Sequence, residues 1–188
     1  MKFITKITSA LILSFGLANA SSYTIDNSHT NVGFSVKHMM ITNVKGEFKT
    51  YDAKIDFDKA TKDFKSFSAN VDIASIDTGI EKRDAHLKSE DFFASEKFPK
   101  MTFVMKSYES NKMKGDLTIR GITKPVVLEV EDLSTIKDFD GNNRIGFTLK
   151  GKINRMDYDL KWNKVLETGG VAVAEEVKII VDVEAVEK

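Results

Sequence analysis

The chain of 188 residues contains no cysteine, and its 28 lysines and arginines balance its 28 aspartates and glutamates. Without cysteine, a disulfide framework and thiolate chemistry are excluded. Without a basic excess, the chain cannot neutralise a nucleic-acid backbone, so nucleic acid is not an expected partner. The sequence also has no block of lysines of the kind that favours an anionic membrane surface.

A run of residues long enough to span a membrane is also lacking. The uncharged apolar stretch Ile7–Leu17 is about a dozen residues, short of the roughly 20 that a span requires. Two lysines precede it and Ala18-Asn19-Ala20 follows it, which is typical of a secretory signal peptide. We therefore expect residues 1–20 to be a signal peptide cleaved after Ala20, and residues 21–188 to form one mature domain. Because no cysteine can carry a lipid, no stable membrane anchor is expected.

The mature chain instead contains many short runs with an apolar residue at every second position. Such alternation places the apolar side chains on one face of a β-sheet and the polar side chains on the other. The clearest runs are Val32–Val36, Ala53–Phe57, Phe67–Ile73, Met101–Met105, Leu117–Ile119, Val126–Val130, Ile145–Ile153 and Val177–Val183. About eight such strands in one domain predict a sheet that closes into a barrel with an apolar interior. That interior either packs solid or holds an apolar guest.

The connections predict an antiparallel arrangement, because most are too short for parallel crossovers. Ser110-Asn111 is expected to form a hairpin turn, and Gly121 with Pro125 a tight corner. Glu81–Phe93 lacks β-branched residues and favours a helical insertion. Ala174–Glu176 interrupts the last strand and predicts a bulge.

Several segments also match a known family in their residues, in the family's order. They are Tyr23–Asp26, His29–His38, Val44–Phe48, Ser75–Thr78, Arg83–Phe93, Phe98–Phe103, Gly115–Val126 and Ile153–Tyr158. In these segments the chain resembles the YceI-like, lipocalin-like polyisoprenoid-binding family. One residue departs from the family pattern: Asp159 follows Tyr158 where the family usually has glycine.

The resemblance implies an all-β fold, an extended eight-stranded antiparallel lipocalin-like barrel with a short helical insertion, in the bacterial periplasm. Family members hold a long isoprenoid or fatty chain in a central pore, so the implied partner is a long-chain lipid, an isoprenoid or a fatty acid or amide. Some members look dimeric, which makes a homodimer one expectation. The family is not known as an enzyme group, and no enzymatic activity or cofactor is expected.

We expect a long hydrocarbon to contact inward-facing apolar side chains. The candidates are Phe34, Val36, Phe48, Ile73, Phe92, Met101, Phe103, Leu117, Ile119, Phe147, Leu149 and Ile153. Met39 and Met40 form either a flexible cap over the guest or ordinary packing under a loop.

The polar candidates are fewer. Arg83 and His86 either contact a lipid head group or orient the helical insertion, and Asn154 and Trp162 are candidates for the pore mouth. The three histidines have no metal-ligand spacing, so no metal site is expected. Adjacent residues of a strand point to opposite faces and no nucleophile elbow is present, which argues against a catalytic triad at Asp26, Ser28 and His29.

Three functions follow from these observations. The first is a periplasmic carrier that holds a long apolar lipid without reacting with it. The second is a filled barrel that acts through its surface as a structural or interaction protein in the envelope stress response. The third is a hydrolase or isomerase acting on a bound lipid, for which His29 or His86 would be required.

Overall fold

A computed structural model describes residues 20–167 and 169–188, so the expected signal peptide lies outside the described residues except for Ala20. Within this part the chain is mostly strand. The strands are β1 (Ser21–Ile25), β2 (Asn31–His38), β3 (Thr42–Phe48), β4 (Tyr51–Asp58), β5 (Asp63–Asp72), β6 (Ile76–Asp77), β7 (Lys100–Glu109), β8 (Lys112–Ile119), β9 (Ile122–Lys137), β10 (Asn143–Asn154) and β11 (Val173–Glu187). The helical segments are α1 (Glu81–Lys88) and the 3₁₀ helices η1 (Ile73–Ser75) and η2 (Arg155–Tyr158). None of the described helices is long and apolar enough to cross a membrane.

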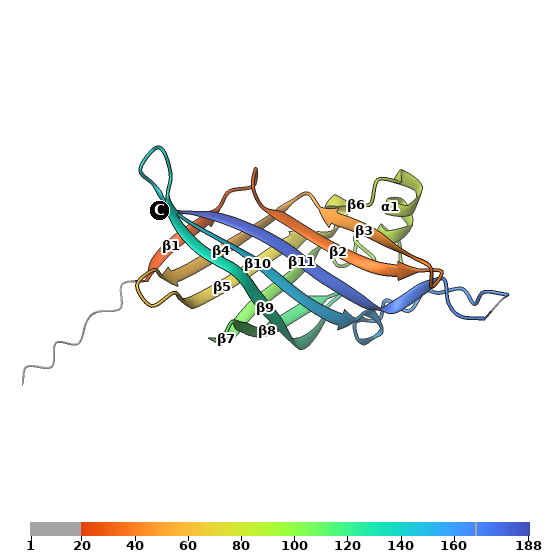
Figure 1. Ribbon diagram of the computed structural model, residues 1–188. Helices are drawn as coiled ribbons and strands as arrows, with labels where there is room; N and C mark the ends of the chain where they lie inside the picture. The colour runs from red at the N-terminus through yellow and green to blue at the C-terminus, as the bar shows by residue number, and fades with distance from the viewer. Residues whose placement is uncertain (1–19, 168) are drawn as a thin grey trace, which may run out of the picture.

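Strand β11 closes the sheet into a barrel, because one of its edges pairs with two strands in succession. Its first part pairs with β2, with Ile179 opposite Phe34, and its last part pairs with β1, with Ala185 opposite Ile25. Its other edge pairs with β10 along almost the whole strand. Figure 1 shows β11 running the length of the molecule between these neighbours. The expected bulge is present, since the register shifts between Val173 and Val177.

The eleven strands of the described residues follow eight paths around the barrel. β1 and β2 run in the same direction along β11, β3 and β4 run in the same direction beside them, and β6 continues β5. Together with β7 to β11 these make eight antiparallel paths. The expected eight-stranded barrel with a short helical insertion is confirmed.

Two expectations about local structure need correction. The helix ends at Lys88 rather than at Phe93, because Ser89 is extended and its hydroxyl donates to the His86 carbonyl at 2.8 Å. Pro125 lies inside β9 opposite Asp116, and the corner is made by Arg120 and Gly121, which both have positive φ. The expected turn at Ser110-Asn111 has φ of 51° and 59°, the left-handed conformation that a two-residue hairpin requires.

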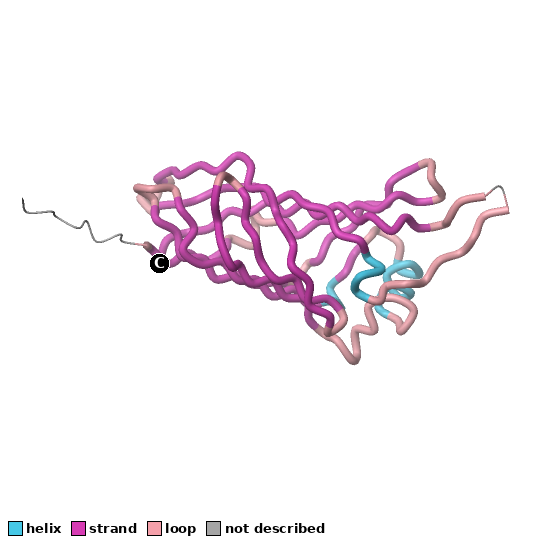
Figure 2. Tube along the Cα trace, turned by 90° about the horizontal axis from the view of Figure 1, so that it is seen from below, coloured by secondary structure: helices cyan, strands magenta, loops and turns pink. Residues whose placement is uncertain are grey.

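The two ends of the barrel differ in how they are filled. The helical segments gather at one end, here called the helix end, as Figure 2 shows. At the opposite end, here called the filled end, aromatic rings pack across the interior. The ring centroid of Phe64 lies 5.0 Å from that of Phe57, 5.0 Å from that of Tyr108 and 4.9 Å from that of Phe147. The filled end is therefore a solid core.

Phe64→Ala should destabilise the fold strongly, because it removes the ring that touches three other rings in this core. We expect the free energy of unfolding to fall by about 3–5 kcal/mol in denaturant titration. Phe139→Ala is the control, since Phe139 is fully exposed, and it should change stability by less than about 0.5 kcal/mol. A Phe64 variant as stable as the control would show that the filled end is not tightly packed.

Candidate functional site

The interior contains a cavity of about 180 Å³. Apolar side chains from the inner faces of the strands form most of its wall. Nine of the residues expected to face a guest line it, and they are Phe34, Val36, Phe48, Met101, Phe103, Leu117, Ile119, Leu149 and Ile153. On β8 the alternation works as expected, since Leu117 and Ile119 are buried while the Thr118 hydroxyl meets the Thr123 hydroxyl at 2.8 Å outside.

Two glycines within strands make room for aromatic rings of this wall. Gly115 of β8 lies under the ring of Phe103, and Gly46 of β3 lies under the ring of Phe34. A Cβ atom at either glycine would collide with the ring beside it. Glycine inside a strand commonly marks such a close approach, so these two positions were a usable sequence signal for the cavity wall.

Other wall residues were not among the candidates drawn from the sequence. Phe67, Val71, Leu128 and Val181 lie on strands that the alternation identifies, so their inward direction could have been inferred. Three further contacts come from outside the strands and have no periodic signal. Leu87 of α1, Phe93 after it and Leu160 after η2 contribute them.

A second cavity of about 400 Å³ lies beside α1 and forms the mouth at the helix end. Phe34, Val36, Leu87 and Val173 line both cavities. The mouth is also lined by Arg83, His86 and Trp162, which were expected there or at a head group, and by Phe92, which was expected to contact the hydrocarbon.

Three rings form an aromatic cluster in the mouth. The His86 ring centroid lies 4.9 Å from that of Trp162 and 5.1 Å from that of Phe92, in edge-on contacts. His86 Nε2 lies 2.8 Å from Asp91 Oδ2, which fixes the imidazole from the other side. The guanidinium of Arg120 donates to the backbone oxygens of Glu90 and Phe92 and holds this loop in place.

Arg83 faces the mouth, but its polar atoms bind the protein. Nε donates to the Thr78 hydroxyl and Nη2 to the Thr78 carbonyl, both at 2.7 Å. The neighbouring Asp84 is buried and accepts from the Thr78 backbone N–H at 3.0 Å. These bonds orient α1 on the turn that precedes it.

Arg155 is a buried arginine of the cavity wall. It donates to the backbone carbonyls of Ala174 at 2.9 Å, Val173 at 3.2 Å and Leu160. Burial lowers its pKa. Because the N–H groups of its guanidinium bind these backbone carbonyls, Arg155 joins η2 to the start of β11 and does not present a free charge to the cavity.

Asp159 occupies the position where the resemblance led us to expect glycine, and the turn has the left-handed conformation that glycine would allow. Its φ is 61°, a conformation that aspartate tolerates better than most residues. Its carboxylate lies 2.8 Å from Lys161 Nζ and 3.8 Å from Arg120 Nη2. The departure from the family pattern therefore leaves this turn of the mouth intact.

Five of the expected contact residues lie elsewhere. Phe147 faces inward but belongs to the filled end, and Ile73 packs in a small core with Phe48, Val71 and Ile76. Asn154 is exposed and caps η2 by accepting from the Met156 N–H at 2.9 Å. Met39 and Met40 are exposed at the β2–β3 turn and line neither cavity.

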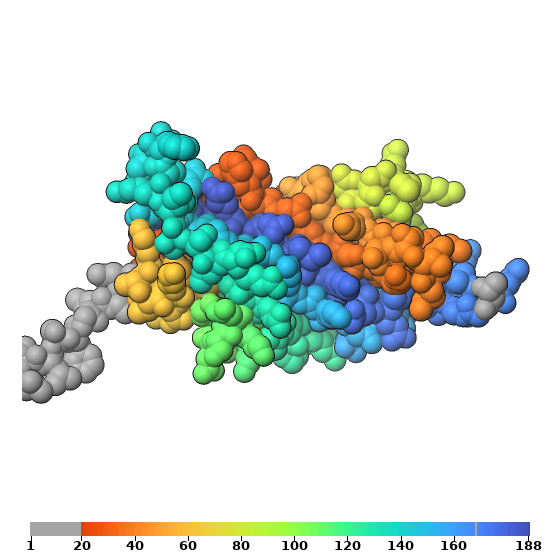
Figure 3. Space-filling model, in the orientation of Figure 1, coloured from red at the N-terminus to blue at the C-terminus, as the bar shows by residue number. Residues whose placement is uncertain are grey.

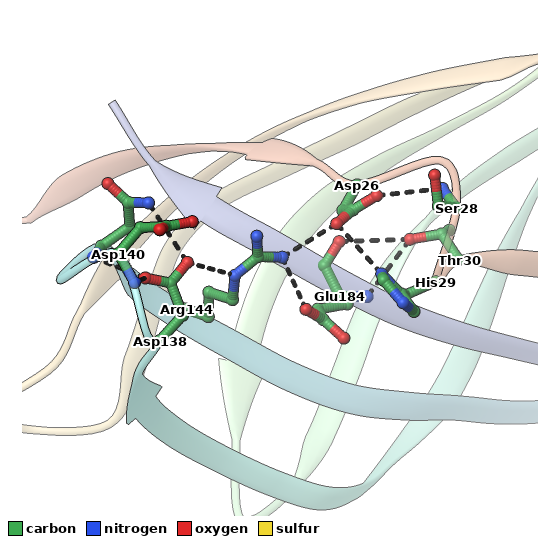
Figure 4. A network of polar contacts seen from close by, with 9 residues as sticks. Asp26, Ser28, His29, Thr30, Asp138, Asp140, Arg144 and Glu184 are labelled. Carbon is green, nitrogen blue, oxygen red and sulfur yellow. Dashed lines mark hydrogen bonds and ion pairs between the residues drawn. The ribbon is translucent and has the colours of Figure 1, made fainter.

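A polar network lies at the filled end (Figure 4). Arg144 Nη1 donates to Asp26 at 2.8 Å and to Glu184 at 2.7 Å, and its Nε donates to Asp138 at 2.7 Å. Asp26, His29 and Glu184 are close enough together to share a metal ion, but Arg144 Nη1 already donates to both carboxylates. Ser28 contacts Asp26 through its backbone N–H, which is not the arrangement of a nucleophile.

Comparison with known proteins gives one consistent result. The family model described as YceI-like domain matches residues 23–185. A UPF0312 protein of Staphylococcus aureus is 41% identical over 161 residues, covering 84% of this chain and 93% of the relative. A crystal structure of a Campylobacter jejuni YceI protein has a TM-score of 0.72 at 43% identity, covering 88% of this chain and 98% of that one.

A second solved structure shares the fold at low identity. It is a polyisoprenoid binding domain from Saccharophagus degradans, with a TM-score of 0.65 at 14% identity. It covers 89% of this chain and 99% of that one. At this identity the likeness shows the fold alone.

Arg144→Met should destabilise the protein by an amount that depends on pH. Hydrogen bonds from Arg144 lower the pKa of Asp26 and lower that of Asp138 from 3.8 to about 2. Carboxylates with lowered pKa stabilise the fold above their unfolded pKa, and this contribution is lost as pH falls through the folded value. The difference in Tm between wild type and variant should therefore be largest above about pH 5 and should decrease as the pH falls from about 4 to about 2.

Lys97→Met is the control, because Lys97 forms an exposed pair with Glu90 that should contribute little at any pH. A difference in Tm for the Arg144 variant that stays constant down to about pH 2 would contradict the assigned ion pairs.

Proposed function

Because the chain belongs to the YceI-like domain family, we propose that it is a carrier that holds a long apolar lipid in the helix-end half of its barrel without reacting with it. The observation that carries the proposal is the apolar cavity and its continuation into the mouth. The proposed cargo is a polyisoprenoid or a fatty acyl derivative. The structural neighbour that is a polyisoprenoid binding domain supports this choice.

The size of the cavities argues for a chain-shaped guest that uses both. The inner cavity of about 180 Å³ is smaller than the roughly 300–1,000 Å³ of typical small-molecule sites. It takes one segment of a chain, and the remainder passes between Phe34 and Leu87 into the mouth of about 400 Å³. A compact ligand would have to fit one cavity alone, whereas a linear chain can occupy the two in succession.

The chemistry of the wall favours hydrocarbon over a charged group. The side chains are almost all apolar, and the guanidinium of Arg155 binds backbone carbonyls. Each buried methylene contributes roughly 0.8 kcal/mol, so a chain of about fifteen carbons has about 12 kcal/mol of gross stabilisation. Lost translation and chain ordering offset a large part of this, which leaves micromolar or tighter binding within reach.

We also propose a periplasmic location. Residues 1–20 have the basic, apolar and small-residue segments of a secretory signal peptide, with cleavage after Ala20. The absence of cysteine after the apolar stretch argues against lipid attachment at this site.

Filling the cavity should abolish uptake of a long-chain probe. Ala69 of β5 lines the cavity, so Ala69→Phe places a ring where the cargo would lie. We expect its affinity for cis-parinaric acid to fall at least about tenfold, equivalent to about 1.4 kcal/mol, in fluorescence titration. Leu117→Trp tests the same cavity from β8 and should give the same result.

Val104→Phe is the matched control, because Val104 follows Phe103 on β7 and points outward, where it is exposed. Its affinity for the probe should equal that of the wild type. Unchanged uptake in folded Ala69 and Leu117 variants would contradict the proposal and favour a barrel that acts only through its surface.

The chain's single tryptophan gives an independent test of the mouth. Trp162 lines the mouth cavity, so a chain passing through it lies against the indole. A fatty acid brominated along its chain should quench Trp162 emission in a saturable manner, while the same fatty acid without bromine should not. Saturable probe binding with no quenching would place the chain elsewhere in the molecule.

A further inference from the structure

The helix end carries a group of exposed aliphatic side chains outside the two cavities. Ile41 is 81% exposed and Val165 is 85% exposed, and Met39 and Met40 are also exposed. These four residues are here called the apolar tip. Exposed aliphatic residues gathered at one place commonly mark an interaction site.

Backbone hydrogen bonds bring the two segments of the tip together. The Met39 N–H donates to the Ala172 carbonyl and the Ala172 N–H donates to the Lys164 carbonyl, both at 2.8 Å. Val165 forms a β-bridge with Val171. The tip is therefore a projecting extension of the sheet, and Figure 3 shows the orange β2–β3 segment and the blue segment that follows η2 at the same end of the molecule.

The backbone of the tip is unusual for the residues that it holds. Met39 has φ of 48° and Met40 has φ of 63°. Glycine and asparagine adopt this left-handed conformation more easily than methionine does. The two-residue hairpin itself requires this conformation, as at Ser110-Asn111, so the unusual feature is that two large apolar side chains stand exposed where glycine or asparagine would form the same turn more easily.

The tip adjoins the mouth. His38 precedes Met39 and Val173 follows Ala172, and both line the mouth cavity. A surface that receives the tip would therefore lie close to the opening through which the proposed cargo passes.

Charge distinguishes this end from the filled end. The β2–β3 hairpin carries Lys37 and Lys45 and no acidic residue between them, and the other segment carries Lys164 before Val165 and Glu167 after it, so the two segments hold three lysines and one glutamate. At the filled end, the exposed Phe139 lies between Asp138 and Asp140. The chain as a whole has no basic excess, so the local charge is what favours an anionic surface here.

We propose that the apolar tip docks on the surface of a lipid bilayer that contains anionic lipids and places the mouth against that surface. A projecting tip with exposed aliphatic side chains and lysines beside them fits a bilayer, because such groups insert at the headgroup level while lysines remain in contact with phosphate. Docking does not require cargo, so the inference goes beyond the carrier function.

Co-sedimentation with vesicles tests the proposal. The mature protein should bind vesicles of phosphatidylcholine mixed with phosphatidylglycerol, and added salt should weaken the binding because it screens the lysines. Pure phosphatidylcholine vesicles should retain much less. The double variant Ile41→Asp with Val165→Asp should lower the partition coefficient at least about tenfold, since it removes apolar contact and adds repulsion.

The control carries the same change at the opposite end. Ile136→Asp with Phe139→Asp alters two exposed apolar residues of the β9–β10 hairpin and should bind vesicles like the wild type. Both variants change exposed positions, and unchanged thermal unfolding would verify that they fold. Equal loss in both variants, or no vesicle binding by the wild type, would overturn the proposal.

Two further measurements distinguish membrane docking from lipid carrying and from dimerisation. The tip variant should keep its affinity for cis-parinaric acid, so docking and carrying can fail independently. Analytical ultracentrifugation should give the same mass for the wild type and the tip variant. A dimer that the tip variant dissociates, with no vesicle binding, would overturn docking and assign the tip to a second copy of the chain.

Discussion

The barrel closes through the pairing of β11, one edge of which is divided between two strands. One edge of this strand serves β2 along its first part and β1 along its last part, while the other edge serves β10. This pairing closes the sheet into a barrel, and residues 26–30 form the break between β1 and β2. Inward apolar residues follow from the closure, because alternation leaves one face of every strand inside.

The two halves of the interior have separate roles as a result. At the filled end, Phe64 and its neighbouring rings pack at native contact distances and stabilise the fold. At the helix end, α1 and the segment after η2 cover the opening without filling it, and a cavity remains. A barrel can thus be stable and hollow at once, since the core that stabilises it is not the volume that the proposed cargo occupies.

Alternation identified the fold and the inward faces, because both depend on local sequence. It placed Leu117 and Ile119 inside as expected, and the residue pattern identified the family. It could not say how far along the barrel an inward residue lies, so Phe147 was assigned to the guest although it belongs to the filled end. Leu87 and Leu160 reach the wall through tertiary placement of α1 and η2, for which the sequence carries no periodic signal. The exposure of Met39 and Met40 depends on a left-handed turn that propensity alone disfavours.

A crystal structure of the mature protein purified from its own host would test whether the helix-end half of the barrel holds a chain while the other half is solid. We expect continuous elongated density that begins beside Trp162, passes Phe34 and ends before the ring of Phe64. Side chains that close the cavity between Phe34 and Phe103, with no density beyond the protein, would contradict the account.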